Sequence, residues 1–345
     1  MIDKLKIENF TVFNKAEFTF STGLNVIIGE NGTGKSHILK LAYSYLRCLF
    51  DTDGGLSFSR DHKSNRQPFF ANEKLMRVFR TDSMANLLHE PNTTTSTITL
   101  ERGKSSMALD LSEDGLLLKG LGPYPVHGAP VFIPAKEVLS FYRGFVSAYD
   151  LRELSFDETY NDLCLALGSS ELREKHQEKV AVLIGELEKV IGGRILFEEG
   201  RAYLSLPSGK KMEVNLLAEG WRKIGMLAYL LRNGSIAPGK CLFWDEPEAN
   251  LNPRLMVILA KVLVALARNG VQIFLASHSL FLVRELVIQS AELKNGGSGP
   301  RYFGLARKKG AAVVTQGDSI EEIEPLSFLD ADLEQSGRYL DLDKR

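Results

Sequence analysis

The stretch Gly29-Glu30-Asn31-Gly32-Thr33-Gly34-Lys35-Ser36 decides the fold of this chain. It fits the phosphate-binding P-loop pattern, in which a glycine and four free positions precede Gly-Lys-Ser. The apolar run at residues 24–28 predicts a buried strand before the loop, and residues 36–50 predict a helix after it. The order strand, loop, helix is the setting in which this motif binds a nucleotide. A glycine-rich turn without a ligand is the alternative, and this setting argues strongly against it.

The chemistry of the loop follows from its residue types. Glycines let the backbone curl so that successive N–H groups point at phosphate oxygens, and the helix N-terminus adds partial positive charge. Lys35 is suited to reach the β- and γ-phosphates of ATP, and the Ser36 hydroxyl is suited to ligand Mg²⁺. The predicted nucleotide-binding residues here are Gly29, Glu30, Asn31, Gly32, Thr33, Gly34, Lys35, Ser36 and His37.

Composition places the chain among ordinary globular proteins. It has 345 residues, 44% of them hydrophobic and 25% charged, with a formal net charge of −1. Such a balance gives no global basic field, so any DNA contact would need a local patch. The three widely spaced cysteines match no metal-ligand spacing and indicate a reducing compartment. Without a signal-peptide core or a long apolar run, we expect a cytoplasmic protein that makes no membrane contact.

Four segments follow from the patterning along the chain. Residues 1–50 carry three short strands and the P-loop helix, the N-terminal part of an ATPase core. Residues 51–130 predict an inserted lobe or sheet extension, and residues 131–215 a mainly helical lobe with a β-hairpin, helical periodicity dominating 138–191. Residues 216–345 return to α/β patterning and complete the core. The fold class is therefore α/β, a P-loop NTPase with a mixed sheet, flanking helices and an inserted α+β and helical lobe.

A second motif completes the nucleotide site. Residues 241–244 form an apolar strand that ends in Asp245 and Glu246, the pattern of a Walker B. The strand carries Asp245 to the carboxyl edge of the sheet, where it would hold Mg²⁺ together with Ser36. Glu246 would polarise the water that attacks the γ-phosphate. Acids at a strand end are common alone, but their pairing with a P-loop makes the functional interpretation the stronger one.

The residues that follow narrow the class. Asp245-Glu246-Pro247-Glu248-Ala249-Asn250-Leu251-Asn252-Pro253 resembles the Walker B and D-loop of ABC-type ATPases, and Leu275-Ala276-Ser277-His278-Ser279 resembles their switch-histidine motif. The resemblance implies that His278 senses the γ-phosphate. Leu217-Ala218-Glu219-Gly220 stands where the ABC signature belongs, with Ala218 in place of the usual serine. It implies that Gly220 and Asn252 contact the nucleotide of a second subunit.

The opening Lys4-Leu5-Lys6-Ile7-Glu8-Asn9-Phe10 extends the resemblance to the SMC, RecF and OLD-type ATPases. It covers the first 50 residues and roughly the last 130, and does not extend convincingly to 51–215. The chain has no long coiled coil and no Toprim segment after His278, so it looks like a stand-alone OLD-like AAA family ATPase. That class implies a homodimer on ATP and a separately encoded protein effector, as in bacterial anti-phage systems.

Three other functions remain open at this stage. The densest basic stretch favours a DNA-binding repair or recombination factor of RecF or SMC type, although a solvated surface is the commoner explanation for such a stretch. An ABC transporter subunit fits the degenerate signature poorly. A metal-dependent nuclease within 51–215 lacks a supporting acidic or histidine cluster. The basic residues concerned are Arg60, His62, Lys63, Arg66, Lys74, Arg77 and Arg80.

Overall fold

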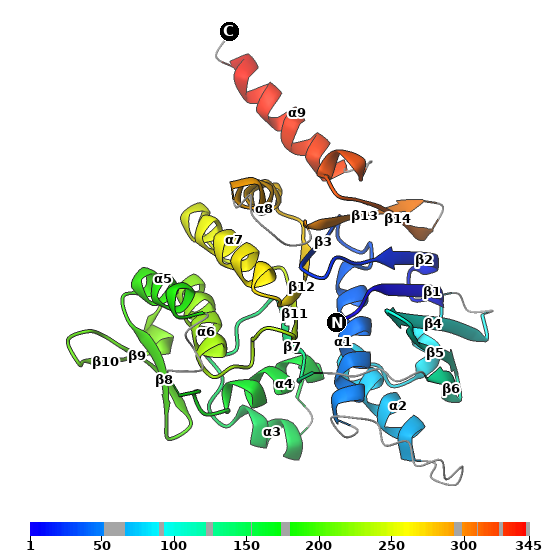
Figure 1. Ribbon diagram of the computed structural model, residues 1–345, viewed down its shortest axis with the longest axis horizontal. Helices are drawn as coiled ribbons and strands as arrows, with labels where there is room; N and C mark the ends of the chain where they lie inside the picture. Colours follow the sequence, from blue (N-terminus) through cyan, green and yellow to red (C-terminus); the bar gives the residue numbers. More distant parts are fainter. Residues whose placement is uncertain are drawn as a thin grey trace.

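The chain folds around a six-stranded, largely parallel sheet (Figure 1). The computed structural model describes residues 1–51, 66–89, 93–121, 127–152, 154–173, 180–292, 299–308, 310–323 and 327–342. The strand order is β14-β13-β3-β12-β11-β7, with β14 antiparallel at one edge and the others parallel. The strands are β3 (Leu24–Gly29), β7 (Val131–Ile133), β11 (Cys241–Asp245), β12 (Gln272–Ser277), β13 (Arg301–Lys308) and β14 (Ala311–Gly317).

The register of this sheet brings three strand ends together. Ile28 of β3 pairs with Ser277 of β12, and Ala276 pairs with Asp245 of β11. Both β3 and β12 are buried along their whole length, as expected for central parallel strands covered on both faces. The segments that leave β3, β11 and β12 therefore start side by side at the carboxyl edge of the sheet, the usual ligand side of an open α/β fold.

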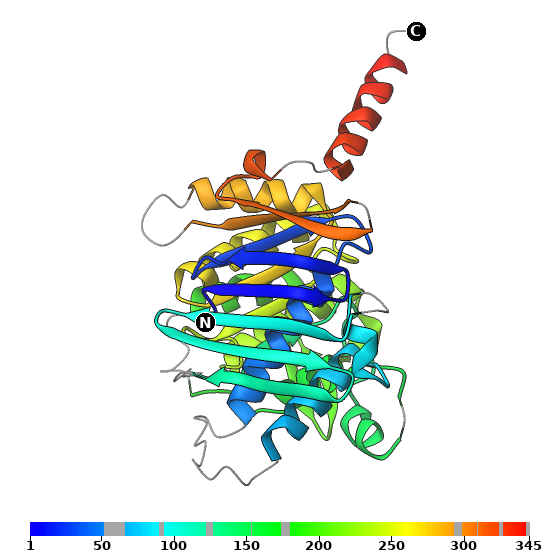
Figure 2. The ribbon, with the colours of Figure 1, turned by 90° about the vertical axis from the view of Figure 1, so that its right-hand side faces the viewer.

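A second, antiparallel sheet packs beside the first, in the order β2-β1-β4-β5-β6 (Figure 2). The main-chain N–H of Ala312 in β14 donates to the Val12 carbonyl at 2.7 Å and links the two sheets. Strands β4 to β6 come from the segment 51–130, so in the structure this segment extends the sheet of β1 and β2. The bounds are β1 (Lys4–Phe10), β2 (Phe13–Thr19), β4 (Thr95–Arg102), β5 (Ser105–Ser112) and β6 (Gly115–Leu121).

Helices cover both faces of the parallel sheet. The P-loop helix α1 lies between the two sheets, where Tyr43 packs edge-on against Phe132 and Phe243. The helices α4 to α8 gather on the other face around a second apolar core (Figure 1). The helix bounds are α1 (Lys35–Asp51), α2 (Arg66–Phe79), α3 (Phe145–Leu151), α4 (Glu158–Leu167), α5 (Ala181–Ile191), α6 (Glu219–Arg232), α7 (Pro253–Arg268), α8 (Leu280–Glu292) and α9 (Ser327–Leu342).

Smaller elements complete the chain. A three-stranded sheet has the order β10-β9-β8, and its hairpin turns at Glu199 and Gly200, both with positive φ. Helix α9 extends away from the rest of the molecule in both views (Figures 1 and 2). The remaining bounds are β8 (Arg194–Glu198), β9 (Arg201–Ser205), β10 (Lys211–Glu213) and the 3₁₀ turns η1 (Met84–Leu87), η3 (Val214–Leu216) and η4 (Ile320–Glu322).

The observed architecture confirms the predicted mixed α/β fold and refines the helical segment. Among the described residues of 138–191, the periodicity corresponds to the helices α3, α4 and α5, whose ends the pattern alone did not give. Strand β7, at the start of the segment 131–215, is a member of the parallel sheet beside β11. The four-segment division of the chain stays a prediction. Across the described residues, no helix is both long and apolar enough to cross a membrane.

Candidate functional site at the carboxyl edge of the sheet

The P-loop joins β3 to α1 through positions that exclude side chains. A Cβ on Gly29 would lie 2.5 Å from the Leu305 carbonyl oxygen, so the neighbouring strand leaves no room for one. Gly34 has φ +97°, and a Cβ there would meet Phe13 at 2.7 Å. The Thr33 hydroxyl donates to the Glu30 carbonyl at 2.8 Å and closes the turn. The glycines of the motif are therefore demanded by the backbone path and by close packing.

Lys35 lies inside this loop. Its ammonium donates to the carbonyl oxygens of Gly29 at 2.8 Å and Glu30 at 2.9 Å, and only 6% of the residue is exposed. Burial lowers the pKa of Lys35, and the nearby charges of Glu246 and Asp245 oppose that shift. The loop thus holds the Lys35 ammonium on its own carbonyl oxygens, near the carboxylates of Asp245 and Glu246.

Asp245 faces the first turn of α1. Burial raises the pKa of its carboxyl, and a hydrogen bond from Ser36 opposes this shift. Its Oδ1 is buried with no hydrogen-bond partner among the described residues. A hydroxyl next to a carboxylate with an unused oxygen is the donor set that Mg²⁺ takes beside nucleotide phosphates. The residues present fit the metal that the P-loop and Walker B predict.

Glu246 and His278 lie opposite each other on neighbouring strand ends. Glu246 adopts φ +47°, sparsely populated for a residue with a side chain, and its N–H donates to the Ala276 carbonyl at 2.9 Å. Nδ1 of His278 lies 3.4 Å from Oε1 of Glu246. One third of the Glu246 side chain and about half of the His278 side chain are exposed (33% and 48%), so both are open to a substrate.

Two buried charged residues near this edge were missed by sequence reasoning. Glu248 accepts hydrogen bonds from the Ser277 hydroxyl at 2.8 Å and from the His278 N–H at 3.0 Å. Lys223 of α6 is completely buried and donates to the Ala249 carbonyl at 2.9 Å. Two signals were available: Lys223 directly precedes an apolar helical run, and Glu248 is a third acid two residues after the Walker B pair.

The residues predicted to act on a partner's nucleotide have contacts within their own chain. Asn252 is the N-cap of α7, where its side chain accepts from the Leu255 N–H at 3.0 Å. Gly220 lies in the first turn of α6, and a Cβ there would meet the Asn250 carbonyl oxygen at 2.9 Å. Gly220 therefore lets α6 pack closely on the predicted D-loop. A role for either residue in a second subunit stays a prediction.

His37 lies one residue beyond the P-loop, and its ring points toward α2. The ring packs edge-on against Phe79 at 5.6 Å, and burial lowers its pKa to about 4. Its ring is committed to packing against α2. A contact of His37 with nucleotide, which stays a prediction, would be left to its main-chain N–H at the start of the helix.

The basic stretch of the sequence is only partly visible. Arg60, His62 and Lys63 lie outside the described residues, as does the side chain of Arg66. Lys74 is buried against Asp162 at 2.6 Å, and Arg77 pairs with Glu73. The Arg80 guanidinium donates to the Ser155 carbonyl at 3.0 Å. Within the described part of the stretch, these cations engage partners in their own chain.

Two family models match regions of this chain. A family model described as "AAA domain, putative AbiEii toxin, Type IV TA system" matches residues 133–284, which include Asp245, Glu246 and His278. A model described as "AAA domain" matches residues 4–99, which include the P-loop. The two matched regions contribute the two halves of the site. The chain is therefore similar to P-loop ATPases of the AAA-domain families.

Solved structures support the fold of this ATPase. The SMC head domain from Thermotoga maritima matches at 15% identity with a TM-score of 0.52, covering 92% of this chain and 98% of that one. An SmcHead bound to the C-winged helix domain of ScpA matches at 14% identity with a TM-score of 0.57, covering 93% and 98%. At such identities the likeness concerns the fold.

One curated relative of the ATPase is similar over a short stretch. The DNA replication and repair protein RecF of Oceanobacillus iheyensis is 33% identical over 66 residues. That stretch is 19% of this chain and 15% of the relative, so the match spans well under two thirds of the relative's length. The ATPase is an ATP-binding protein of this class. Its partners and output are matters for proposal.

Proposed function

We propose that this ATPase hydrolyses ATP at the carboxyl edge of the parallel sheet and uses the bound nucleotide as a switch. The observation that carries the proposal is the convergence of Lys35 and Ser36 with Asp245, Glu246 and His278, which come from three separate strand ends. This convergence supports roles as a phosphate-binding loop, a metal-binding acid, a base and a sensor, because a purely structural turn would not require it.

Each residue then has one proposed task. The P-loop N–H groups and Lys35 would bind the β- and γ-phosphates, and Ser36 and Asp245 would hold Mg²⁺. When bound, Mg²⁺ neutralises charge that develops on the phosphate oxygens. Glu246, whose side chain is one third exposed and lies beside His278, would orient the attacking water and accept its proton. His278 would donate a hydrogen bond to the γ-phosphate and so distinguish ATP from ADP.

A calorimetric titration tests the binding part of this proposal. The Lys35→Ala substitution removes the cation held by Gly29 and Glu30, and it should abolish measurable ATP binding. A Lys40→Ala variant is the matched control, because Lys40 lies on the same helix and pairs with Asp157 at 2.7 Å. Retained affinity in Lys35→Ala would mean that the loop is not a nucleotide site.

We further propose that two copies close on ATP. The N-terminus of α6, which carries the signature-like segment, is flanked by exposed apolar side chains: Leu216 is 76% exposed and Trp221 is 40% exposed. Large exposed apolar groups beside a candidate trans contact support a second copy as the occupant. Light scattering of Glu246→Gln with and without ATP tests this, since slowed hydrolysis should accumulate the dimer. An ATP-independent mass would contradict it.

The output of the switch would be control of a separately encoded protein effector. The AbiEii description of one matching family and the ScpA domain bound to an SmcHead support a partner protein for this fold. A role in anti-phage defence is part of this proposal. Affinity purification of Glu246→Gln with ATP, compared with Lys35→Ala, should recover the effector only with the first protein. Equal recovery with both would exclude ATP control.

A second candidate function is DNA binding in repair or recombination, and the RecF similarity favours it. Neutralising Arg60, Lys63 and Arg66 together should weaken binding to duplex DNA and reduce its salt dependence. A triple variant that removes three positive charges from α7 and α9 provides a charge-matched control: Arg254→Gln, Lys261→Gln and Arg338→Gln. Unchanged affinity in the first variant would discard the basic stretch as a DNA site.

A nuclease in the segment 51–215 gains no support. Among the residues that the structure describes, no three His, Cys, Asp or Glu side chains gather into a group that could hold a metal ion.

A further inference from the structure

Glu248 occupies an unusual position for a carboxylate. It comes three residues after Asp245, at the carboxyl edge of the sheet, yet only 7% of the residue is exposed. Burying an ionised carboxylate is unfavourable unless hydrogen bonds and opposite charge compensate it. The contacts of Glu248 therefore indicate its role.

The hydrogen bonds of Glu248 go to the segment that carries His278. Oε1 accepts from the Ser277 hydroxyl at 2.8 Å and from the main-chain N–H of His278 at 3.0 Å. The Ser277 oxygen in turn accepts from the Ser279 N–H at 3.1 Å. One carboxylate oxygen thus holds the Ser277 hydroxyl and the His278 N–H, and the Ser277 hydroxyl in turn holds the Ser279 N–H.

The same oxygen also faces the His278 ring. Nδ1 of His278 lies 3.7 Å from Oε1 of Glu248 and 3.4 Å from Oε1 of Glu246. The ring's Nδ1 edge is thereby directed to the two carboxylates. Because the two imidazole nitrogens are on different sides of the ring, Nε2 remains for the substrate.

A buried cation supports this arrangement from α6. Lys223 is fully buried, and its ammonium holds the Ala249 carbonyl, the residue after Glu248. Burial lowers the pKa of Lys223, and the charges of Glu219 and Glu248 oppose that shift. Lys223 therefore compensates the acids at this edge and connects α6, the signature-like helix, to the segment that positions His278.

We propose that Glu248 is a positioning residue that aims His278 at the γ-phosphate, and that Lys223 secures it to α6. The proposal deepens the proposed ATP switch and rests on it. Glu248 acts through the His278 main chain and the Ser277 hydroxyl. It should therefore affect discrimination between ATP and ADP more than binding of the phosphates that ATP and ADP share.

The test is a double-variant cycle on nucleotide preference. Calorimetry with Mg²⁺ gives the ratio of ADP to ATP dissociation constants for the wild type, Glu248→Gln, His278→Ala and the double variant. Each single variant should lower that ratio by about tenfold or more, the effect of one hydrogen bond to a charged group. ADP affinity should stay within about twofold, and the double variant should be no worse than the worse single variant. Hydrolysis should show the same pattern in kcat with KM for ATP little changed.

Controls separate positioning from general damage. Asp162→Asn alters another buried carboxylate, on α4. It should lower thermal stability about as much as Glu248→Gln does, but leave the preference for ATP over ADP unchanged. Ser277→Ala removes one of the donors to Glu248 and serves if Glu248→Gln does not fold; it should lower the preference in the same direction.

The outcomes distinguish this inference from the proposed function. If His278→Ala lowers the preference and Glu248→Gln and Ser277→Ala do not, Glu248 has no positioning role and the ATP switch stands. Additive losses in the double variant would likewise overturn positioning, since the two residues would act independently. If Lys35→Ala still binds ATP, the proposed function itself fails.

Discussion

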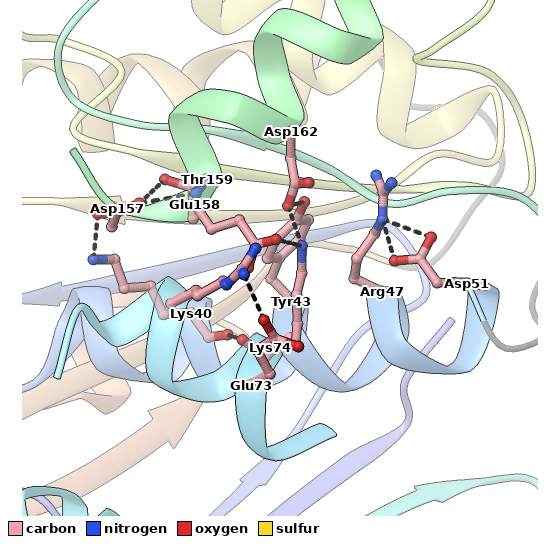
Figure 3. A network of polar contacts seen from close by, with 12 residues as sticks. Lys40, Tyr43, Arg47, Asp51, Glu73, Lys74, Asp157, Glu158, Thr159 and Asp162 are labelled. Atoms are coloured by element: carbon pink, nitrogen blue, oxygen red, sulfur yellow. Dashed lines mark hydrogen bonds and ion pairs between the residues drawn. The ribbon is translucent and has the colours of Figure 1, made fainter. Parts of the chain in front are cut away.

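The buried ion pair between α2 and α4 gives the sharpest prediction about what holds the P-loop helix in place (Figure 3). The Lys74 ammonium lies 2.6 Å from Oδ2 of Asp162 and 3.2 Å from Oε1 of Glu158. The Tyr43 hydroxyl of α1 donates to the same Asp162 oxygen at 2.6 Å. The side chains of Lys74 and Asp162 are 9% and 6% exposed, so solvent screens this pair little.

The Lys74→Met substitution removes the cation that pairs with Asp162 and should lower the free energy of unfolding by about 3–5 kcal/mol. With a urea dependence of about 3 kcal/mol/M, the midpoint would fall by about 1–1.7 M. The Lys74→Met, Asp162→Asn double variant should recover most of the loss, because Asn still accepts from Tyr43 and no unpaired charge remains at that position.

The loss should also depend on pH. Burial already raises the pKa of Glu158, and Lys74 opposes that shift, so its removal raises the pKa further. A carboxyl with a folded pKa above its unfolded value binds extra protons in the folded state, and stability falls as pH rises above the unfolded value. The defect of Lys74→Met, measured by urea unfolding, should therefore be larger at pH 8 than at pH 5. A loss below about 1 kcal/mol at both pH values would refute the reasoning.

Three further predictions concern single residues of the site. Burial lowers the pKa of His37 to about 4. The contribution of neutral His37 to the free energy of unfolding should therefore be fully present above pH 6.5 and fall by about 3 kcal/mol toward pH 4. Thermal unfolding of His37→Phe should lack this pH dependence. Gly220→Ala places a Cβ 2.9 Å from the Asn250 carbonyl. It should cost about 1–3 kcal/mol on thermal unfolding and reduce the ATP-dependent mass change in light scattering. Asn252→Ala removes the α7 cap, and urea unfolding should show a loss of about 1 kcal/mol. If Gly220→Ala or Asn252→Ala unfolds as the wild type does, the contact assigned to that residue does not contribute to stability.

The elements with local signals could be predicted from sequence. The P-loop, the strand before Asp245 and the three opening strands depend on short motifs and on apolar periodicity, which the chain carries within a few residues. The convergence of Lys35, Asp245 and His278 followed once parallel strands were assumed, because parallel strands share one carboxyl edge.

Features that depend on contacts far apart in sequence were not predictable. The burial of Glu248 arises from its bonds to Ser277 and His278, 29 and 30 residues away. The close approach of Gly220 to Asn250 requires the packing of α6 on the predicted D-loop. Helical periodicity over 138–191 could not give the ends of α3, α4 and α5, because each of these helices buries apolar residues in one shared core.

The central claim is that the carboxyl-edge site hydrolyses ATP with Glu246 as the residue that activates water. Its most direct test is phosphate release under single-turnover conditions, with protein in excess over ATP, for the wild type, Glu246→Gln and Lys35→Ala. We predict that Glu246→Gln binds ATP as the wild type does but releases phosphate at least about 100-fold more slowly, and that Lys35→Ala does neither. Phosphate release at the wild-type rate by either variant would contradict the claim.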